Sequence, residues 1–159
     1  MRYTILALLL CGCVSTQTAT VNTATQYYGL NERTNRQELT ELMGVDPVRY
    51  EWCAAFVNSI LDLNDIPGSD TVSDHPLMAR SFLTWGEKVN DEPQKGDIVV
   101  FPRGNQGWQG HVGFYIETQM VDGITHYVIL GGNQNNEVNY ELYPAWKALS
   151  IRRYYINQN

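Results

Sequence analysis

Cys53, His111 and the neighbouring amides Asn133 and Gln134 are the side chains of this sequence whose types could together carry out nucleophilic catalysis. Cys53 lies in the stretch RYEWCAAFVNSILDL, in a helix expected over about residues 52–63. Unpaired backbone N–H groups and the helix dipole favour a thiolate in the first turn of a helix. A single cysteine among apolar residues is also a common core residue, so this stretch alone fits both roles.

A cysteine nucleophile needs a base to take its proton, and histidine suits that role because its ordinary pKa is near neutrality. The chain has three histidines, His75, His111 and His126. His111 begins the alternating stretch HVGFYI, whose apolar residues share one face of an expected strand. Its imidazole is expected on the opposite face, with a glycine on either side leaving space, so His111 is the best-placed base.

The stretch GGNQNN follows the next expected strand and supplies polar groups that could orient the imidazole. Such a group fixes which ring nitrogen of the histidine carries the proton. Asn133 and Gln134 are the candidates, and the two glycines before Asn133 allow a close approach of the backbone. The same residues are also typical of an ordinary turn.

Helices come first and strands afterwards in the elements expected around these residues. The spacing of apolar residues predicts helices at about 34–44, 52–63 and 76–85. Strands are expected at 96–101, 111–116, 126–130, 137–143 and 150–156, with a hairpin turning at Asp122 and Gly123. This order predicts an α+β fold, with the helices packed on a small antiparallel sheet.

The composition, with 43% hydrophobic and 18% charged residues, is that of a globular protein. The length of the chain allows one domain, which we expect at residues 28–159. A net charge of −6, without any run of Lys or Arg, argues against a nucleic-acid partner. The cysteines and histidines lack metal-finger spacing, and nucleotide-binding motifs are missing from the sequence. We therefore expect neither a metal nor another cofactor.

The first residues, MRYTILALLLCGC, have the pattern of a secretory signal over 1–12, with Arg2 followed by an apolar core. That core is shorter than the roughly 20 residues that span a membrane. The ending at Cys11 and Cys13 resembles a bacterial lipobox, which implies a lipid on Cys13 and a protein anchored in the cell envelope, facing the periplasm in a Gram-negative cell. Secretion without a lipid is the alternative. Residues 13–27 are rich in Ser, Thr and Ala and are expected to form a flexible tether.

Four segments, WCAAFVNSIL, KGDIVVFPRG, GHVGFYIE and VILGGNQNNEVNY, resemble the CHAP and NlpC-type cysteine hydrolases of bacterial cell walls, in the same order. The resemblance covers roughly residues 50–156 and implies a papain-like fold. It makes Cys53 the nucleophile, His111 the general base and Asn133 the orienting residue, with Gln134 as a substitute.

The sequence departs from these families at two positions. Many CHAP enzymes have a glutamate at the position of Gly131, so the orienting role passes to Asn133 by default. Many NlpC-type enzymes have a serine at the position of Ala54. The oxyanion donors are then expected among the backbone N–H groups near Cys53.

The resemblance implies attack of the Cys53 thiolate on an amide carbonyl in the peptide stem of peptidoglycan, through a thioester and without a metal. Trp108, Tyr50 and Glu51 are candidate contacts of the substrate groove. Trp108 fits equally well as a loop aromatic folded over the core. Two other functions stay open, a non-catalytic envelope lipoprotein that binds wall peptides and a related Cys/His acyltransferase.

Overall fold

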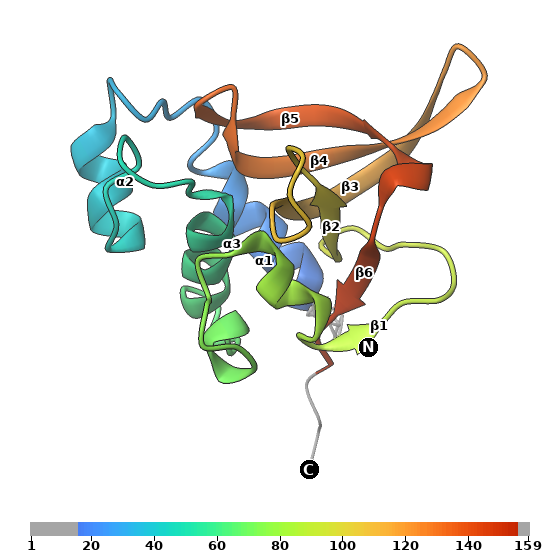
Figure 1. Ribbon diagram of the computed structural model, residues 1–159, viewed down its shortest axis with the longest axis horizontal. Coiled ribbons are helices and arrows are strands. Elements are labelled where there is room, and N and C mark those ends of the chain that lie inside the picture. Colours follow the sequence, from blue (N-terminus) through green and yellow to red (C-terminus); the bar gives the residue numbers. More distant parts are fainter. Residues whose placement is uncertain (1–15, 156–159) are drawn as a thin grey trace, which may run out of the picture.

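The computed structural model describes residues 16–155, in which helices cover one face of a single β-sheet (Figure 1). The α-helices are α1 Thr16–Thr25, α2 Arg36–Met43 and α3 Cys53–Asp62, and the 3₁₀ helices are η1 Ser69–Thr71, η2 Ala79–Leu83 and η3 Ala145–Lys147. The strands are β1 Glu87–Lys88, β2 Ile98–Pro102, β3 Gly110–Val121, β4 Ile124–Gln134, β5 Glu137–Pro144 and β6 Ser150–Arg153. They lie in the order β1-β6-β2-β3-β4-β5, and all neighbours are antiparallel. The α+β fold predicted from the sequence is confirmed.

Helix α1 replaces most of the tether that the sequence predicts. Its side chains Val21 and Ala24 are buried, at 2% and 0% exposure, against α3 and β4. Gln17 donates a hydrogen bond to the carbonyl of Tyr154, which ties α1 to the last described residues. The sequence of this segment predicts a flexible tether because its small uncharged residues form no amphipathic pattern. The helix is stabilised instead by tertiary packing. The tether prediction is therefore corrected for residues 16–25, whereas Cys13 and the signal at 1–12 lie outside the described residues.

Two other elements differ in extent from the sequence prediction. The helix expected at 76–85 forms only as the five-residue η2, because residues 75–78 form a turn in which the Met78 N–H donates to the His75 carbonyl, and the carbonyl of Pro76 accepts from the side chain of Asn58. The strands of the β3–β4 hairpin are longer than expected. Their turn is where the sequence places it, with positive φ at both Asp122 and Gly123, as a two-residue hairpin turn requires.

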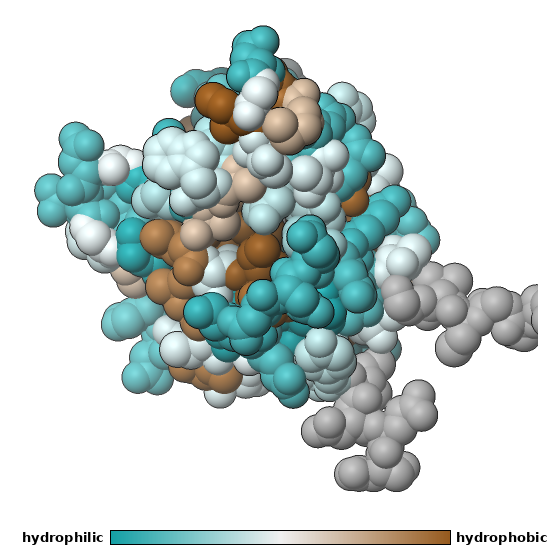
Figure 2. All heavy atoms as spheres, turned by 90° about the vertical axis from the view of Figure 1, so that its right-hand side faces the viewer, coloured by the Kyte–Doolittle hydropathy of each residue, from teal (hydrophilic) through white to brown (hydrophobic). Residues whose placement is uncertain are grey.

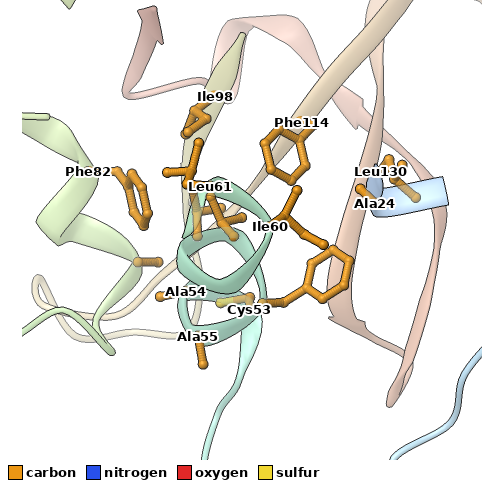
Figure 3. Close-up of a cluster of buried hydrophobic side chains, with 14 of the residues drawn as sticks. Ala24, Cys53, Ala54, Ala55, Ile60, Leu61, Phe82, Ile98, Phe114 and Leu130 are labelled. Atoms are coloured by element: carbon orange, nitrogen blue, oxygen red, sulfur yellow. The ribbon is translucent and has the colours of Figure 1, made fainter. Parts of the chain in front are cut away.

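Helix α3 forms the centre of the main core. Trp52, Phe56 and Ile60 are fully buried against the face of β3 and β4 that carries Phe114. Figure 3 looks along this helix, which lies between the side chains of η2 and those of the sheet. A Cβ atom at Gly132 would lie only 2.5 Å from the Trp52 ring, so the start of α3 sits directly against β4. This contact places the residue after Trp52 beside the sheet.

The opposite face of the sheet carries a second, smaller core of Val99, Phe101, Tyr115 and Ile129. On the side of the molecule that Figure 2 presents, apolar residues lie in several groups surrounded by hydrophilic ones. None of the helices within residues 16–155 is long and apolar enough to cross a membrane.

Candidate active site

Cys53 is the first residue of α3 and is almost completely buried, with 3% of its surface exposed. Its side chain lies in the main core cluster (Figure 3). It also lines a pocket of about 330 Å³. The other residues that line this pocket are Glu51, Leu77, Met78, Ala79, Arg103, Trp108, Gln109 and Gly110. The pocket therefore gives a ligand a route to the sulfur between the start of α3 and the loop that joins β2 to β3.

Burial raises the pKa of Cys53 above its ordinary value, and the charge of Glu51 acts in the same direction. The charge of Arg103 and the backbone N–H groups of Val112 and Ala54 lower the pKa, but burial is the largest cause. The expectation that the helix N-terminus would yield a thiolate is therefore corrected, because loss of solvent outweighs the N–H groups. At neutral pH the resting state holds a thiol.

The same interactions locate the sulfur. Val112 follows His111 directly on β3, so an N–H group of Val112 that influences the sulfur places Cys53 against the start of this strand. The Ala54 N–H belongs to the first turn of α3, where backbone donors have no intrahelical partner. From the sequence, the oxyanion donors are expected among the backbone N–H groups near Cys53, and the Ala54 N–H is one of these groups.

His111 is 1% exposed, and its Nε2 atom lies 2.9 Å from Oε1 of Gln134. The Nε2 atom of Gln134 donates to the carbonyls of Ile129 and Asn139, which fixes the orientation of its amide. Oε1 of Gln134 can only accept, so Nε2 of His111 must donate. The Nδ1 atom of the neutral ring is then the proton acceptor. It is the single buried side-chain nitrogen or oxygen in residues 16–155 without a hydrogen-bond partner.

Burial and, to a smaller extent, the nearby charge of Arg103 lower the pKa of His111 to about 3, although the hydrogen bond that the ring donates to Gln134 acts to raise it. The ring is therefore neutral at pH 7. Cys53 and His111 form no hydrogen bond with each other, because Nδ1 has no partner and Nε2 bonds to Gln134.

Gln134, and not Asn133, contacts the imidazole, which corrects the orienting role predicted for Asn133. The register of β3 and β4 pairs Phe114 with Leu130, and a regular continuation would bring Asn133 opposite His111. The pairing of β4 with β5 shifts between Gly131 and Gln134, so one extra residue moves the following side chain to the other face.

The missing side chain at Gly131 leaves the room that Gln134 uses. A Cβ atom at Gly131 would lie 3.1 Å from Oε1 of Gln134 and 3.4 Å from Nε2 of His111. The Gln134 amide thus fills the space beside the imidazole into which a longer residue at position 131 would project.

Tyr143 and Arg103 belong to the site and were not identified from the sequence. The Tyr143 ring stacks on His111, with 5.3 Å between ring centroids and 19° between planes, and also on Phe101. Burial raises the pKa of Tyr143, whose hydroxyl donates to Glu141. Arg103 stands in the KGDIVVFPRG segment directly after β2, so its position in a family motif was an available signal. Tyr143 offered no such signal.

The three expected groove residues lie at different places. Glu51 and Trp108 both line the pocket, and Trp108 is 60% exposed at its edge, so it does not fold over the core. Tyr50 is also exposed but does not line this pocket. In residues 16–155 no group of three or more His, Cys, Asp or Glu side chains is arranged to hold a metal ion.

The low pKa of His111 predicts sensitivity of the fold to acid. In the unfolded chain His111 binds a proton below about pH 6.5, whereas the folded protein resists protonation until about pH 3. Stability contributed by the neutral ring is therefore lost as the pH falls through this window. At pH 4.5 we expect His111 to lower the free energy of unfolding by about 2–3 kcal/mol relative to pH 7.

Urea unfolding at both pH values, compared with the His111→Gln variant, measures this effect. A glutamine at this position can keep a donor toward Gln134 but does not titrate. An equal loss of stability between pH 7 and 4.5 in both proteins would contradict the prediction.

A family model for the CHAP domain matches residues 45–133, which is more than half of the chain and includes Cys53, His111 and Asn133. Gln134 lies immediately after the matched segment. No curated protein and no solved structure matches the chain.

Proposed function

The chain belongs to the CHAP domain family, and on that basis we propose that it is a cysteine amidase or endopeptidase that cleaves an amide bond in the peptides of peptidoglycan. CHAP domains are generally hydrolases of the amidase and peptidase classes that act on peptidoglycan. The observation that supports the finer assignment is the buried Nδ1 atom of His111, which has no hydrogen-bond partner. His111 directly precedes Val112, whose backbone N–H lowers the pKa of Cys53.

In the proposed reaction, the Cys53 thiol gives its proton to Nδ1 of His111 while sulfur forms a bond to the substrate carbonyl carbon. The Ala54 N–H is a donor for the resulting oxyanion. The C–N bond then breaks, and the proton on Nδ1 passes to the leaving amine, which leaves a thioester on Cys53. Water, deprotonated by His111, attacks the thioester, releases a carboxylic acid and returns the thiol.

We further propose that the protein is exported and carries a lipid on Cys13. The support is the lipobox-like sequence before that residue. Helix α1 begins at Thr16, so the folded domain starts three residues after Cys13. A lipid there would hold the domain close to the membrane, and the substrate class is consistent with a location in the envelope.

A second candidate function is a wall-binding lipoprotein without catalysis. The observations in its favour are the buried, protonated thiol of Cys53 and the lack of a hydrogen bond from Cys53 to His111. A protein of this kind would keep the pocket and bind peptides without cutting them.

Digestion of purified sacculi, with mass spectrometry of the soluble fragments, tests the proposal. We expect fragments in which one amide bond of the stem or cross-link has gained water. Fragments that carry a new acyl acceptor would favour an acyltransferase. Sedimentation of the protein with intact sacculi, without soluble products, would overturn the hydrolase and favour the wall-binding lipoprotein.

A further inference from the structure

Glu51 lies in the same pocket as Cys53, two residues before it, and its side chain is 81% exposed. The Oε2 atom of Glu51 accepts a hydrogen bond of 2.6 Å from Nδ2 of Asn133 and lies 3.6 Å from Nη1 of Arg103. Within residues 16–155, no hydrogen bond or ion pair involves Oε1 of Glu51. One oxygen of this carboxylate is thus held in place by the protein, and the other is available to a ligand.

Asn133 forms hydrogen bonds with both Glu51 and Arg103. Its side chain binds Glu51, and its backbone carbonyl accepts a hydrogen bond of 3.1 Å from Nη2 of Arg103. Its backbone has a φ of +57°, a conformation uncommon for residues other than glycine, at the irregular end of β4. Such conformations persist where the surroundings impose them and cluster at functional sites. Asn133 is therefore a positioning residue for Glu51.

We propose that Oε1 of Glu51 binds a primary ammonium group of the substrate, so that the enzyme prefers wall peptides with a free amine near the scissile amide. This specificity rests on the proposed function. The carboxylate suits a cation because it is the more exposed member of its ion pair, 81% against 35% for Arg103. An ammonium group donates N–H hydrogen bonds, and a carboxylate oxygen without a partner can accept them. In wall peptides that group is either a terminal α-amine or the side-chain amine of a diamino acid.

A bound ammonium group would also act on the nucleophile. The charge of Glu51 disfavours the Cys53 thiolate, and the charge of Arg103 favours it. Neutralising Glu51 removes one of the two influences that raise the pKa of Cys53 and leaves that of Arg103 in place, so the substrate itself promotes transfer of the proton from Cys53. The Glu51→Gln variant should then show two opposite effects, faster alkylation of Cys53 at a given pH and slower turnover of amine-bearing substrates.

The experiment compares the wild type, Glu51→Gln and Glu38→Gln on substrates with free or acetylated amines. Glu38 is an exposed carboxylate on α2 that does not line the pocket, so its variant controls for the loss of one negative charge. Untreated and acetylated sacculi test the side-chain amine, and synthetic stem peptides with a free or acetylated terminus test the α-amine. Iodoacetamide alkylation of Cys53 at pH 8 provides the second readout.

With the wild type and the Glu38→Gln variant, we expect acetylation of one of the two amines to lower kcat/KM, or the initial rate on sacculi, by about five- to tenfold. The Glu51→Gln variant should not distinguish acetylated from free substrate, and its alkylation should be faster than that of the wild type. A preference that persists in this variant, or equal cleavage of all substrates by the wild type, would overturn the ammonium subsite alone. Absence of cleavage from every substrate would instead overturn the hydrolase, and the subsite with it.

Discussion

Replacement of Cys53 by alanine is expected to abolish the release of peptide fragments from sacculi, with a loss in rate of at least about a thousandfold. Hydrolysis through a thioester cannot begin without the sulfur, and the neutral ring of His111 then has no proton to accept. The folded structure should survive, because alanine suits a helix and the change removes one atom beside Ala54. We expect the free energy of unfolding to change by about 1 kcal/mol, measured by urea unfolding.

Binding to sacculi separates the loss of chemistry from the loss of substrate. The Cys53→Ala variant keeps Glu51, Arg103 and Trp108, so it should sediment with sacculi as well as the wild type does. Cys53→Ser is the matched control for size, and its hydroxyl is a much weaker nucleophile at neutral pH. Fragments released equally by the wild type and the alanine variant would overturn Cys53 as the nucleophile.

Local patterns were sufficient for the fold class and for the placement of the two central residues. The apolar stripe of α3 predicted both the helix and its buried side, and alternation in β3 placed His111 on the face opposite Phe114. The pair Asp122 and Gly123 located the hairpin turn because few residues accept the backbone conformation it needs. Each of these features depends on residues close together in the sequence.

Features that depend on distant segments were missed. The irregularity at the end of β4 exchanges the expected positions of Asn133 and Gln134 around His111, and strand alternation cannot reveal it. Helix α1 exists through its contacts with α3 and β4, and not through its own composition. The protonation state of Cys53 is governed by burial, whereas sequence position revealed only its place at a helix start.

Replacement of Gln134 by leucine is expected to lower kcat by about a hundredfold or more, because the imidazole of His111 loses the acceptor that fixes its proton on Nε2. The same change leaves that nitrogen and the carbonyls of Ile129 and Asn139 without the partner they have now. We therefore also expect a loss of roughly 2–4 kcal/mol in the free energy of unfolding. Activity is to be measured on sacculi, with the folded fraction of each variant determined by urea unfolding.

Two further variants make the comparison decisive even where the leucine variant folds poorly. Gln134→Glu keeps an acceptor for Nε2 of His111, and its negative charge should raise the pKa of the ring, so the acidic limb of the pH–rate profile should move to higher pH. Asn133→Gly removes the other amide and suits the positive φ at this position. It should change kcat less than about threefold, since the contact between Gln134 and His111 remains, whereas loss of the amide that holds Glu51 should raise KM for substrates with a free amine. A larger loss in the Asn133 variant than in the Gln134 variants would return the orienting role to Asn133, because only a residue that fixes the imidazole should control the chemical step.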